Sequence, residues 1–336
     1  MRRSTVLSII VGLLIIILLF IRIGFKEIYE LLLRVNIPLF FLAVLLGLLS
    51  MLVAGLRWSI ISSTLDVHLG FFNAAMYRVM GFAVLYSTPT SIVGAETTRA
   101  LLASRDSGRS ISTCIQISIL DRTIEMVTVL IIMVLGSLFS LIIFSPGILG
   151  MLLLLLLPIV ILSLIYITLF IIPKKSYHKK GIIGRLFVSL KKIYHNTYFL
   201  FRHRKRILLY AFLLTLLQIF FTVLLFSSIL AMVIDAPLFE LLKYSFLAYL
   251  FSVLSSLIPI PLGLGSLEAG QLVAFSIMGL SSSIAIFSAF TLRLKDVFIA
   301  MIGGLLFMIK GLPRRVERWI DLKRLEEWIN FNNSKK

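Results

Sequence analysis

The sequence predicts an all-α polytopic membrane protein with two inverted-topology repeats that contain broken or re-entrant helices. The prediction rests on composition, on long apolar runs, and on landmarks that recur half a chain apart. Of 336 residues, 60% are hydrophobic and only 14% are charged, and the mean hydropathy is +1.06. A soluble domain is about a quarter charged. The chain therefore has too little polar surface for a protein folded in water.

Apolar runs recur along the whole chain. A helix needs about 20 apolar residues to cross a hydrocarbon core of about 30 Å, and lipid requires each backbone polar group to be paired within its segment. The runs are Thr5–Ile21, Ile37–Trp58, Met126–Phe144, Ile148–Ile172, Ile207–Val233, Phe246–Ile260 and Ile284–Ile309. They lack the alternation typical of barrel strands, so membrane helices are predicted.

The first element, residues 1–36, is predicted to be a transmembrane helix with its linker. A cleavable signal peptide begins in a similar way, but the residues after the apolar run offer no small-x-small cleavage site. The chain has one cysteine, Cys114, so no disulfide can form within it.

The net charge of +18 is concentrated in two segments. Residues 173–206 hold eleven Lys/Arg and no acid, and residues 310–336 hold eight Lys/Arg and four acids. This distribution is typical of positive-inside orientation and of contact with anionic lipid at the cytoplasmic surface; it does not indicate nucleic-acid binding. We expect a multi-pass cell-membrane protein with both termini in the cytoplasm. The same count places Arg57 in a cytoplasmic segment, residues 57–70.

The connector, residues 145–206, is predicted to hold a helix and then a basic cytoplasmic loop. Apolar residues at helical spacing over 182–201 favour a helix lying in the interface; a solvated connector is the alternative. The tail, residues 311–336, is similar. The histidines of the basic loop lack metal-site spacing, so neither a metal nor another cofactor is expected.

Paired landmarks recur with an offset of 171 or 172 residues. They are Pro89 and Pro261, Glu96 and Glu268, Gly108 and Gly279, Arg122 and Arg293, and Glu125 and Asp296. The predicted repeats, 37–144 and 207–310, begin on opposite sides of the membrane. Inverted repeats with broken helices are typical of secondary transporters, whose substrate site lies near the midplane between the halves.

Two apolar stretches, Phe71–Ser104 and Tyr244–Leu280, are interrupted, and each is either two short membrane spans or one re-entrant hairpin. The candidate break residues are Pro89, Gly94, Pro261, Gly263 and Gly265. A half-helix that begins near Ser91 or Ser266 would point free N–H groups at the break and favour an anion such as phosphate. The alternative is that Glu96 and Glu268 only offset the helix dipole.

Charged residues within the predicted membrane segments form the candidate substrate site. Each costs about 2.5–3.5 kcal/mol at a helix centre, so we expect ion pairs: Glu96 with Arg99 or Arg122, Arg122 with Glu125, and Arg293 with Glu268 or Asp296. The candidates are Glu96, Arg99, Asp121, Arg122, Glu125, Glu268, Arg293 and Asp296. Arg122 and Arg293 could bind a phosphate bidentately, leaving the glutamates for a cationic head group.

The same motifs carry a family resemblance. They are Gly94 with Glu96 and Arg99, then Asp121-Arg122, then Pro261-Leu262-Gly263-Leu264-Gly265-Ser266-Leu267-Glu268, and last Leu292-Arg293-Leu294. Over about residues 5–310 the sequence resembles the flippase-like membrane domain of lysylphosphatidylglycerol synthases, in its stand-alone form. The resemblance implies lipid translocation, or a role in envelope lipid or glycan assembly. The 27 residues after Ile309 are too few for a synthase domain.

The expected function is transport of a phospholipid or lipid-linked head group across the bilayer. No catalytic or phosphate-loop motif is found, so we do not expect an enzyme. The alternatives are a membrane-embedded transferase and a scaffold subunit in envelope lipid or glycan assembly. Each of these three functions is compatible with a homo-oligomer or with an envelope-biosynthesis partner.

Overall fold

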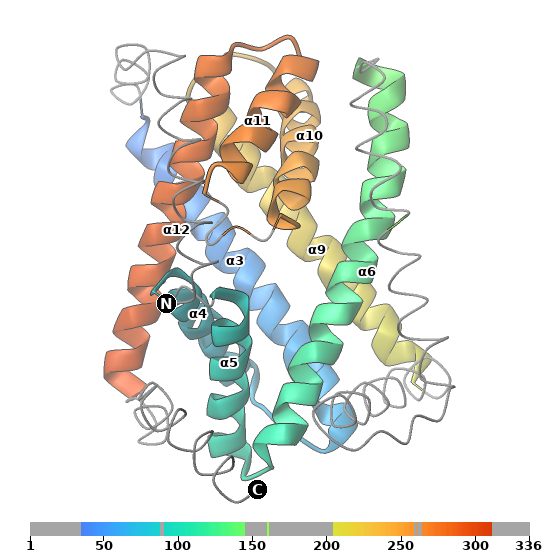
Figure 1. Ribbon diagram of the computed structural model, residues 1–336, viewed down its shortest axis with the longest axis vertical. Helices are drawn as coiled ribbons and strands as arrows, with labels where there is room; N and C mark the ends of the chain where they lie inside the picture. Colours follow the sequence, from blue (N-terminus) through green and yellow to red (C-terminus); the bar gives the residue numbers. More distant parts are fainter. Residues whose placement is uncertain are drawn as a thin grey trace, which may run out of the picture.

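The computed structural model describes residues 35–87, 91–144, 160, 204–258, 260 and 264–310. Three predicted segments lie outside this part of the chain: the N-terminal helix up to residue 34, nearly all of the connector, and the tail from residue 311. Within the described residues all regular structure is helical, as predicted (Figure 1).

Among the described residues, four α-helices precede the connector and four follow it. The first four are α3 (Ile37–Ser62), α4 (Phe71–Ser87), α5 (Ser91–Ser107) and α6 (Ile111–Phe144), with a short 3-10 turn, η1 (Ser63–Leu65), after α3. The second four are α9 (Lys205–Leu230), α10 (Leu238–Ser256), α11 (Ser266–Ile277) and α12 (Ser282–Lys310). The predicted helix starts at Ser91 and Ser266 are confirmed.

Local sequence explains several helix ends. Asn36 caps α3 by accepting a hydrogen bond of 3.2 Å from the Leu39 N–H. Gly108 precedes α6 with φ +68°, and Gly279 precedes α12 with φ +71°. Only glycine adopts this left-handed conformation readily, so two of the paired sequence landmarks also share a backbone conformation.

Four helices of the described chain are long and apolar enough to cross a membrane. They lie at Ile37–Leu65, Ile111–Phe139, Lys205–Leu230 and Leu238–Ser256. Large apolar side chains on α6 and α9, such as Leu135 and Phe220, are exposed, as expected of surfaces that face lipid. The chain is a multi-pass helical membrane protein.

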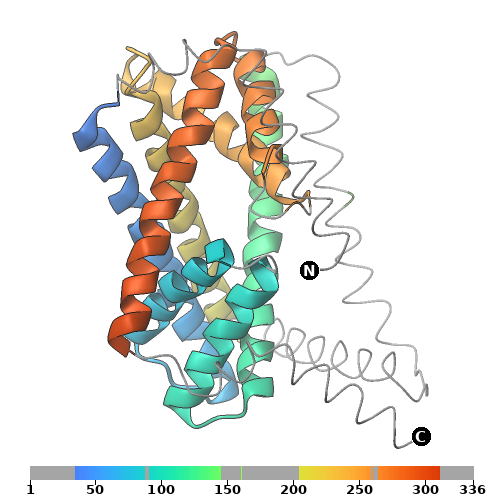
Figure 2. The same cartoon turned by 60° about the vertical axis from the view of Figure 1, so that its left-hand side comes forward.

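The helices form a central pair with a hairpin at either end (Figures 1 and 2). Helices α3 and α9 lie side by side and run in opposite directions. The α4–α5 hairpin occupies the lower half of Figure 1 and the α10–α11 hairpin the upper half, and in each hairpin the end of the first helix and the start of the second lie toward the middle of the molecule. Helices α6 and α12 flank them, again in opposite directions. Helix α11 has 12 residues, about 18 Å, which is too short to cross the hydrocarbon core.

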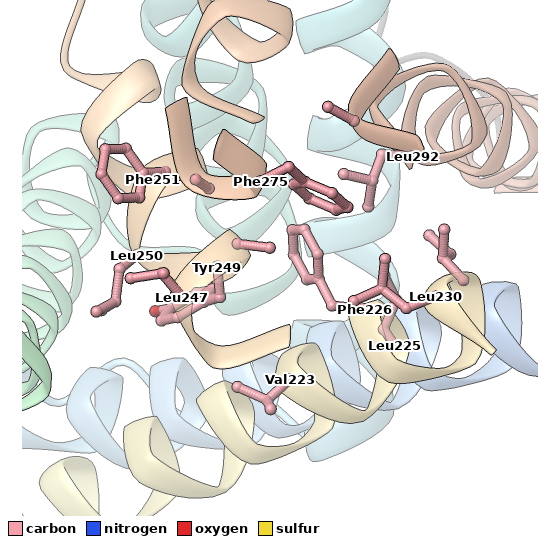
Figure 3. Close-up of a cluster of buried hydrophobic side chains, with 14 of the residues drawn as sticks. Val223, Leu225, Phe226, Leu230, Leu247, Tyr249, Leu250, Phe251, Phe275 and Leu292 are labelled. Carbon is pink, nitrogen blue, oxygen red and sulfur yellow. The ribbon is translucent and has the colours of Figure 1, made fainter. Parts of the chain in front are cut away.

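Aromatic and aliphatic side chains fill the space between α9, α10, α11 and α12 (Figure 3). Phe226, Tyr249 and Phe275 come from three different helices and are buried in one cluster. Elsewhere glycine permits closer contact, as small residues do between membrane helices. A Cβ on Gly55 would lie 2.4 Å from the Ala75 Cα, and one on Gly303 would lie 2.4 Å from the Val79 carbonyl oxygen. Helix α4 is therefore held tightly between α3 and α12.

Candidate functional site

Seven charged side chains from α3, α4, α5 and α6 form one ion-pair network, the first charged cluster. Its members are Arg57, Arg78, Glu96, Arg99, Asp121, Arg122 and Glu125. All five site residues predicted in the first half of the chain belong to it. The network therefore joins residues that are up to 68 positions apart in the sequence.

The centre of the cluster is the pair of Arg57 and Asp121, whose side chains are both 0% exposed. Arg57 Nε donates to Asp121 Oδ1 at 2.8 Å, and Nη2 lies 2.8 Å from Glu125 Oε2. Its Nη1 donates to Thr215 Oγ1 at 3.0 Å and to Gln218 Oε1 at 2.8 Å, both on α9. Arg57 thus links α3 to α6 through ion pairs and to α9 through hydrogen bonds.

Arg78 of α4 brings a second guanidinium to the same two carboxylates, Asp121 and Glu125. It contacts Asp121 at 3.2 Å and both oxygens of Glu125 at 3.1 and 3.2 Å. Gln218 donates a further hydrogen bond of 2.8 Å to Glu125. Arg57 and Arg78, which we call the inner arginines, therefore balance two carboxylates deep between the helices.

The outer edge of the cluster is centred on Glu96. Its Oε2 accepts from Arg99 Nη1 and its Oε1 from Arg122 Nη2, both at 2.7 Å. Arg122 also contacts Glu125 at 3.1 Å, and its side chain is 40% exposed, against 18% for Glu96. The predicted pairs of Glu96 and of Arg122 with Glu125 are present. Burial thus decreases from Asp121 outward to Arg122.

The cluster contains four arginines and three carboxylates, so its formal charge is +1. Arg99 is 3% exposed and lies over the ring of Trp58, with its guanidinium carbon 4.4 Å from the ring centroid. This aromatic face stabilises the arginine but adds no negative charge. Such a site can accept a monoanion without reversing its own sign.

A second charged cluster joins α4, α11 and α12 through Tyr86, Glu268, Arg293, Lys295 and Asp296. Arg293 Nε lies 2.5 Å from Glu268 Oε1, and Nη2 donates to Oε2 at 3.0 Å, which is the predicted pair. Tyr86 donates to Asp296 Oδ2 at 2.8 Å, and Lys295 pairs with the same carboxylate. The two acids and two bases balance.

Glu268 also caps its own helix. The Gly265 N–H donates to Glu268 Oε2 at 2.9 Å, and Gly265 itself has φ +79°. The reading of Glu268 as an acid in the first turn of a half-helix is therefore correct, alongside its pairing with Arg293. Gly94 lies half-buried in α5. The other break residues, Pro89, Pro261 and Gly263, lie outside the described residues.

The sequence did not predict the inner arginines or the contribution of α9 to the site. The sequence places Arg57 in a cytoplasmic segment and not among the candidate site residues, whereas α3 continues to Ser62 and the Arg57 side chain is completely buried. Arg78, Tyr86 and Gln218 were not among the candidates. For Arg78 a signal existed, since it is a charged residue in a predicted membrane segment. No sequence signal marks Gln218, because its partners lie 93 and 161 residues away.

No group of three or more His, Cys, Asp or Glu suited to a metal ion occurs within the described ranges. The site's chemistry is that of guanidinium and carboxylate groups, which bind and release charged groups. Arginine forks in particular recognise phosphate and carboxylate bidentately.

Comparison with protein-family models matches residues 5–304 to the lysylphosphatidylglycerol synthase TM region. The chain belongs to this family. The match includes every residue of both charged clusters, and it agrees with the stand-alone membrane domain that the motifs predicted. No curated protein and no solved structure matches the chain.

Proposed function

We propose that the protein moves a phospholipid or lipid-linked head group across the bilayer, with the first charged cluster as its substrate site. One observation carries this proposal: seven charged side chains are gathered among apolar helices, and Arg122 at their edge is 40% exposed. Charges inside a membrane protein are costly and mark substrate or ion pathways. The family's description, which names a lipid-modifying synthase, supports a lipid as the substrate.

The proposal includes two inverted repeats, 37–144 and 207–310, with the substrate moving between them. Each half has a long helix, two shorter helices in a hairpin, and a second long helix. Corresponding helices run in opposite directions (Figure 1). Ser50 and Thr222, which are 172 residues apart, hydrogen bond at 3.3 Å. Contact between matched residues is expected where a two-fold axis passes between α3 and α9.

We further propose how the protein is oriented in the membrane and which lipids lie at its cytoplasmic surface. The basic connector and tail place both termini in the cytoplasm of a cell-membrane protein, where they attract anionic lipid. The α4–α5 hairpin would then enter from the cytoplasm and the α10–α11 hairpin from outside, as re-entrant pairs. Alternating access by one half against the other would expose the cluster to each leaflet in turn.

The experiment is lipid translocation in proteoliposomes, followed with fluorescent phospholipids whose outer-leaflet label can be quenched. Wild type should move label between leaflets, whereas Arg122→Ala and Glu96→Gln should fall to the rate of empty liposomes while keeping their elution volume in detergent. Lys243→Gln is the matched control, because Lys243 pairs with Glu240 away from both clusters. A wild-type rate equal to that of empty liposomes for anionic, zwitterionic and polyprenyl-phosphate lipids would reject transport and favour a transferase or scaffold.

A further inference from the structure

The uncompensated positive charge of the first charged cluster lies at its outer edge. The inner arginines are matched by Asp121 and Glu125. Arg99 and Arg122, by contrast, both make their shortest contact, 2.7 Å, with the single carboxylate of Glu96, and their contacts with the inner carboxylates, at 3.3 and 3.1 Å, are shared with Arg57 and Arg78. Two guanidiniums therefore depend chiefly on one carboxylate, and of the two it is Arg122, 40% exposed, that is open to solvent or lipid.

Three buried N–H groups at this edge have no hydrogen-bond partner among the described residues. They are Trp58 Nε1, Arg99 Nε and Arg122 Nε. Buried donors are nearly always paired, and a donor left unpaired costs about 1–3 kcal/mol. Since all three are donors, the group that would satisfy them is an acceptor, and an anion fits the charge of the edge as well.

We propose that this edge binds one singly charged phosphate, the phosphodiester of an anionic phospholipid head group, and that Glu96 is the counterion it displaces from Arg122. The inference rests on the proposed function and specifies its substrate. A phosphodiester presents two acceptor oxygens to the Nε and Nη2 of a guanidinium. When it binds Arg122, Glu96 retains Arg99, so no carboxylate is left unpaired. On release, Glu96 returns to Arg122.

Charge arithmetic selects the class of head group. The cluster carries +1, so one negative charge makes it neutral, whereas a phosphomonoester with two charges would leave it at −1. A zwitterionic head group adds an ammonium that needs a carboxylate. Within the described residues, Glu268 and Asp296 are engaged by Arg293, Gly265, Tyr86 and Lys295. Phosphatidylglycerol is therefore preferred to phosphatidylcholine.

The test measures binding separately from transport. Purified protein in a non-ionic detergent is titrated with short-chain phosphatidylglycerol, short-chain phosphatidylcholine or inorganic phosphate, and binding is followed calorimetrically. We expect wild type to bind phosphatidylglycerol at least about tenfold more tightly than phosphatidylcholine, a factor typical of one charge-assisted hydrogen bond. Glu96→Gln removes the competing counterion, so it should bind phosphatidylglycerol about tenfold more tightly and yet translocate it more slowly.

Two further variants keep the test decisive if one variant fails to fold. Arg122→Lys preserves the charge but lacks Nε and the planar fork, so it should lose most of the preference for phosphatidylglycerol. Lys243→Gln should bind as wild type does. Weaker phosphatidylglycerol binding in Glu96→Gln would overturn the counterion role. Equal binding of inorganic phosphate would overturn the lipid as its source.

The two proposals can fail separately. Phosphatidylglycerol binding with the expected response to Glu96→Gln, but no lipid movement in proteoliposomes, would reject transport and keep the head-group site. Lipid movement at equal rates for phosphatidylglycerol and phosphatidylcholine, unaffected by Glu96→Gln, would keep transport and reject the site.

Discussion

Replacing Arg57 by methionine tests whether the first charged cluster is held by local hydrogen bonding or by its total charge. Methionine keeps most of the volume of the side chain and removes the guanidinium. By charge alone the variant is better balanced than wild type, with three arginines and three carboxylates. By geometry it is worse, because Asp121 loses its 2.8 Å partner and the Arg57 bonds to Thr215 and Gln218 disappear.

The contacts that Asp121 keeps determine how much unfolding free energy the Arg57→Met variant loses. Removing one partner of a buried pair costs about 3–5 kcal/mol. The low end applies here, because Asp121 keeps Arg78 at 3.2 Å and Arg99 at 3.3 Å. We therefore expect Arg57→Met to lower the free energy of unfolding by about 3 kcal/mol, measured by reversible denaturation in mixed micelles. Arg122→Gln, at the half-exposed edge, should cost about 1 kcal/mol or less.

The control is Lys243→Met, which breaks an ion pair whose Glu240 side chain is 36% exposed. It should change the free energy of unfolding by less than about 1 kcal/mol. If Arg57→Met is as stable as wild type, total charge governs the cluster, and the hydrogen bonds of Arg57 do not hold its centre together. The same holds if Arg122→Gln is equally destabilised.

Two further variants test the packing of α12 and its link to α4. Gly303→Ala should destabilise the protein by about 1–3 kcal/mol, because the new Cβ would lie 2.4 Å from the Val79 carbonyl oxygen. The control is Gly304→Ala, whose Cβ would have no atom within 4 Å and which should be neutral or stabilising. Equal stabilities of the two variants in thermal unfolding would contradict the close α4–α12 contact. Tyr86→Phe should cost about 1 kcal/mol through loss of the 2.8 Å bond to Asp296, and additivity with Asp296→Asn in a double-mutant cycle would show that the bond does not form.

The class of fold was accessible from sequence because its signals are local. Apolar runs mark α3, α6 and α9, and the helix starts at Ser91 and Ser266 follow directly from the breaks before them. Pairs close in sequence, such as Arg122 with Glu125, were predicted from helical spacing. Both are properties of a single segment, which a hydropathy profile and the helical period capture.

The centre of the cluster was not accessible, because it depends on contacts between segments. Arg57 lies near the end of an apolar run, where an arginine can equally well extend its side chain to the interface. What buries it is Asp121, 64 residues away, and Gln218, 161 residues away. Nothing near Arg57 in the sequence distinguishes these two environments. The inverted relation of the halves stays a prediction.

The order of synthesis gives the Arg57–Asp121 pair a consequence for biogenesis. Translation at about 5–20 residues per second makes Asp121 roughly 3–13 s after Arg57, since 64 residues separate them. Gln218 follows later still. During that interval the guanidinium needs another partner, and its place near the end of α3 lets it reach lipid phosphates at the membrane surface. The newly inserted α3 is therefore expected to sit shallower than in the finished protein, and to move inward when α6 and α9 arrive.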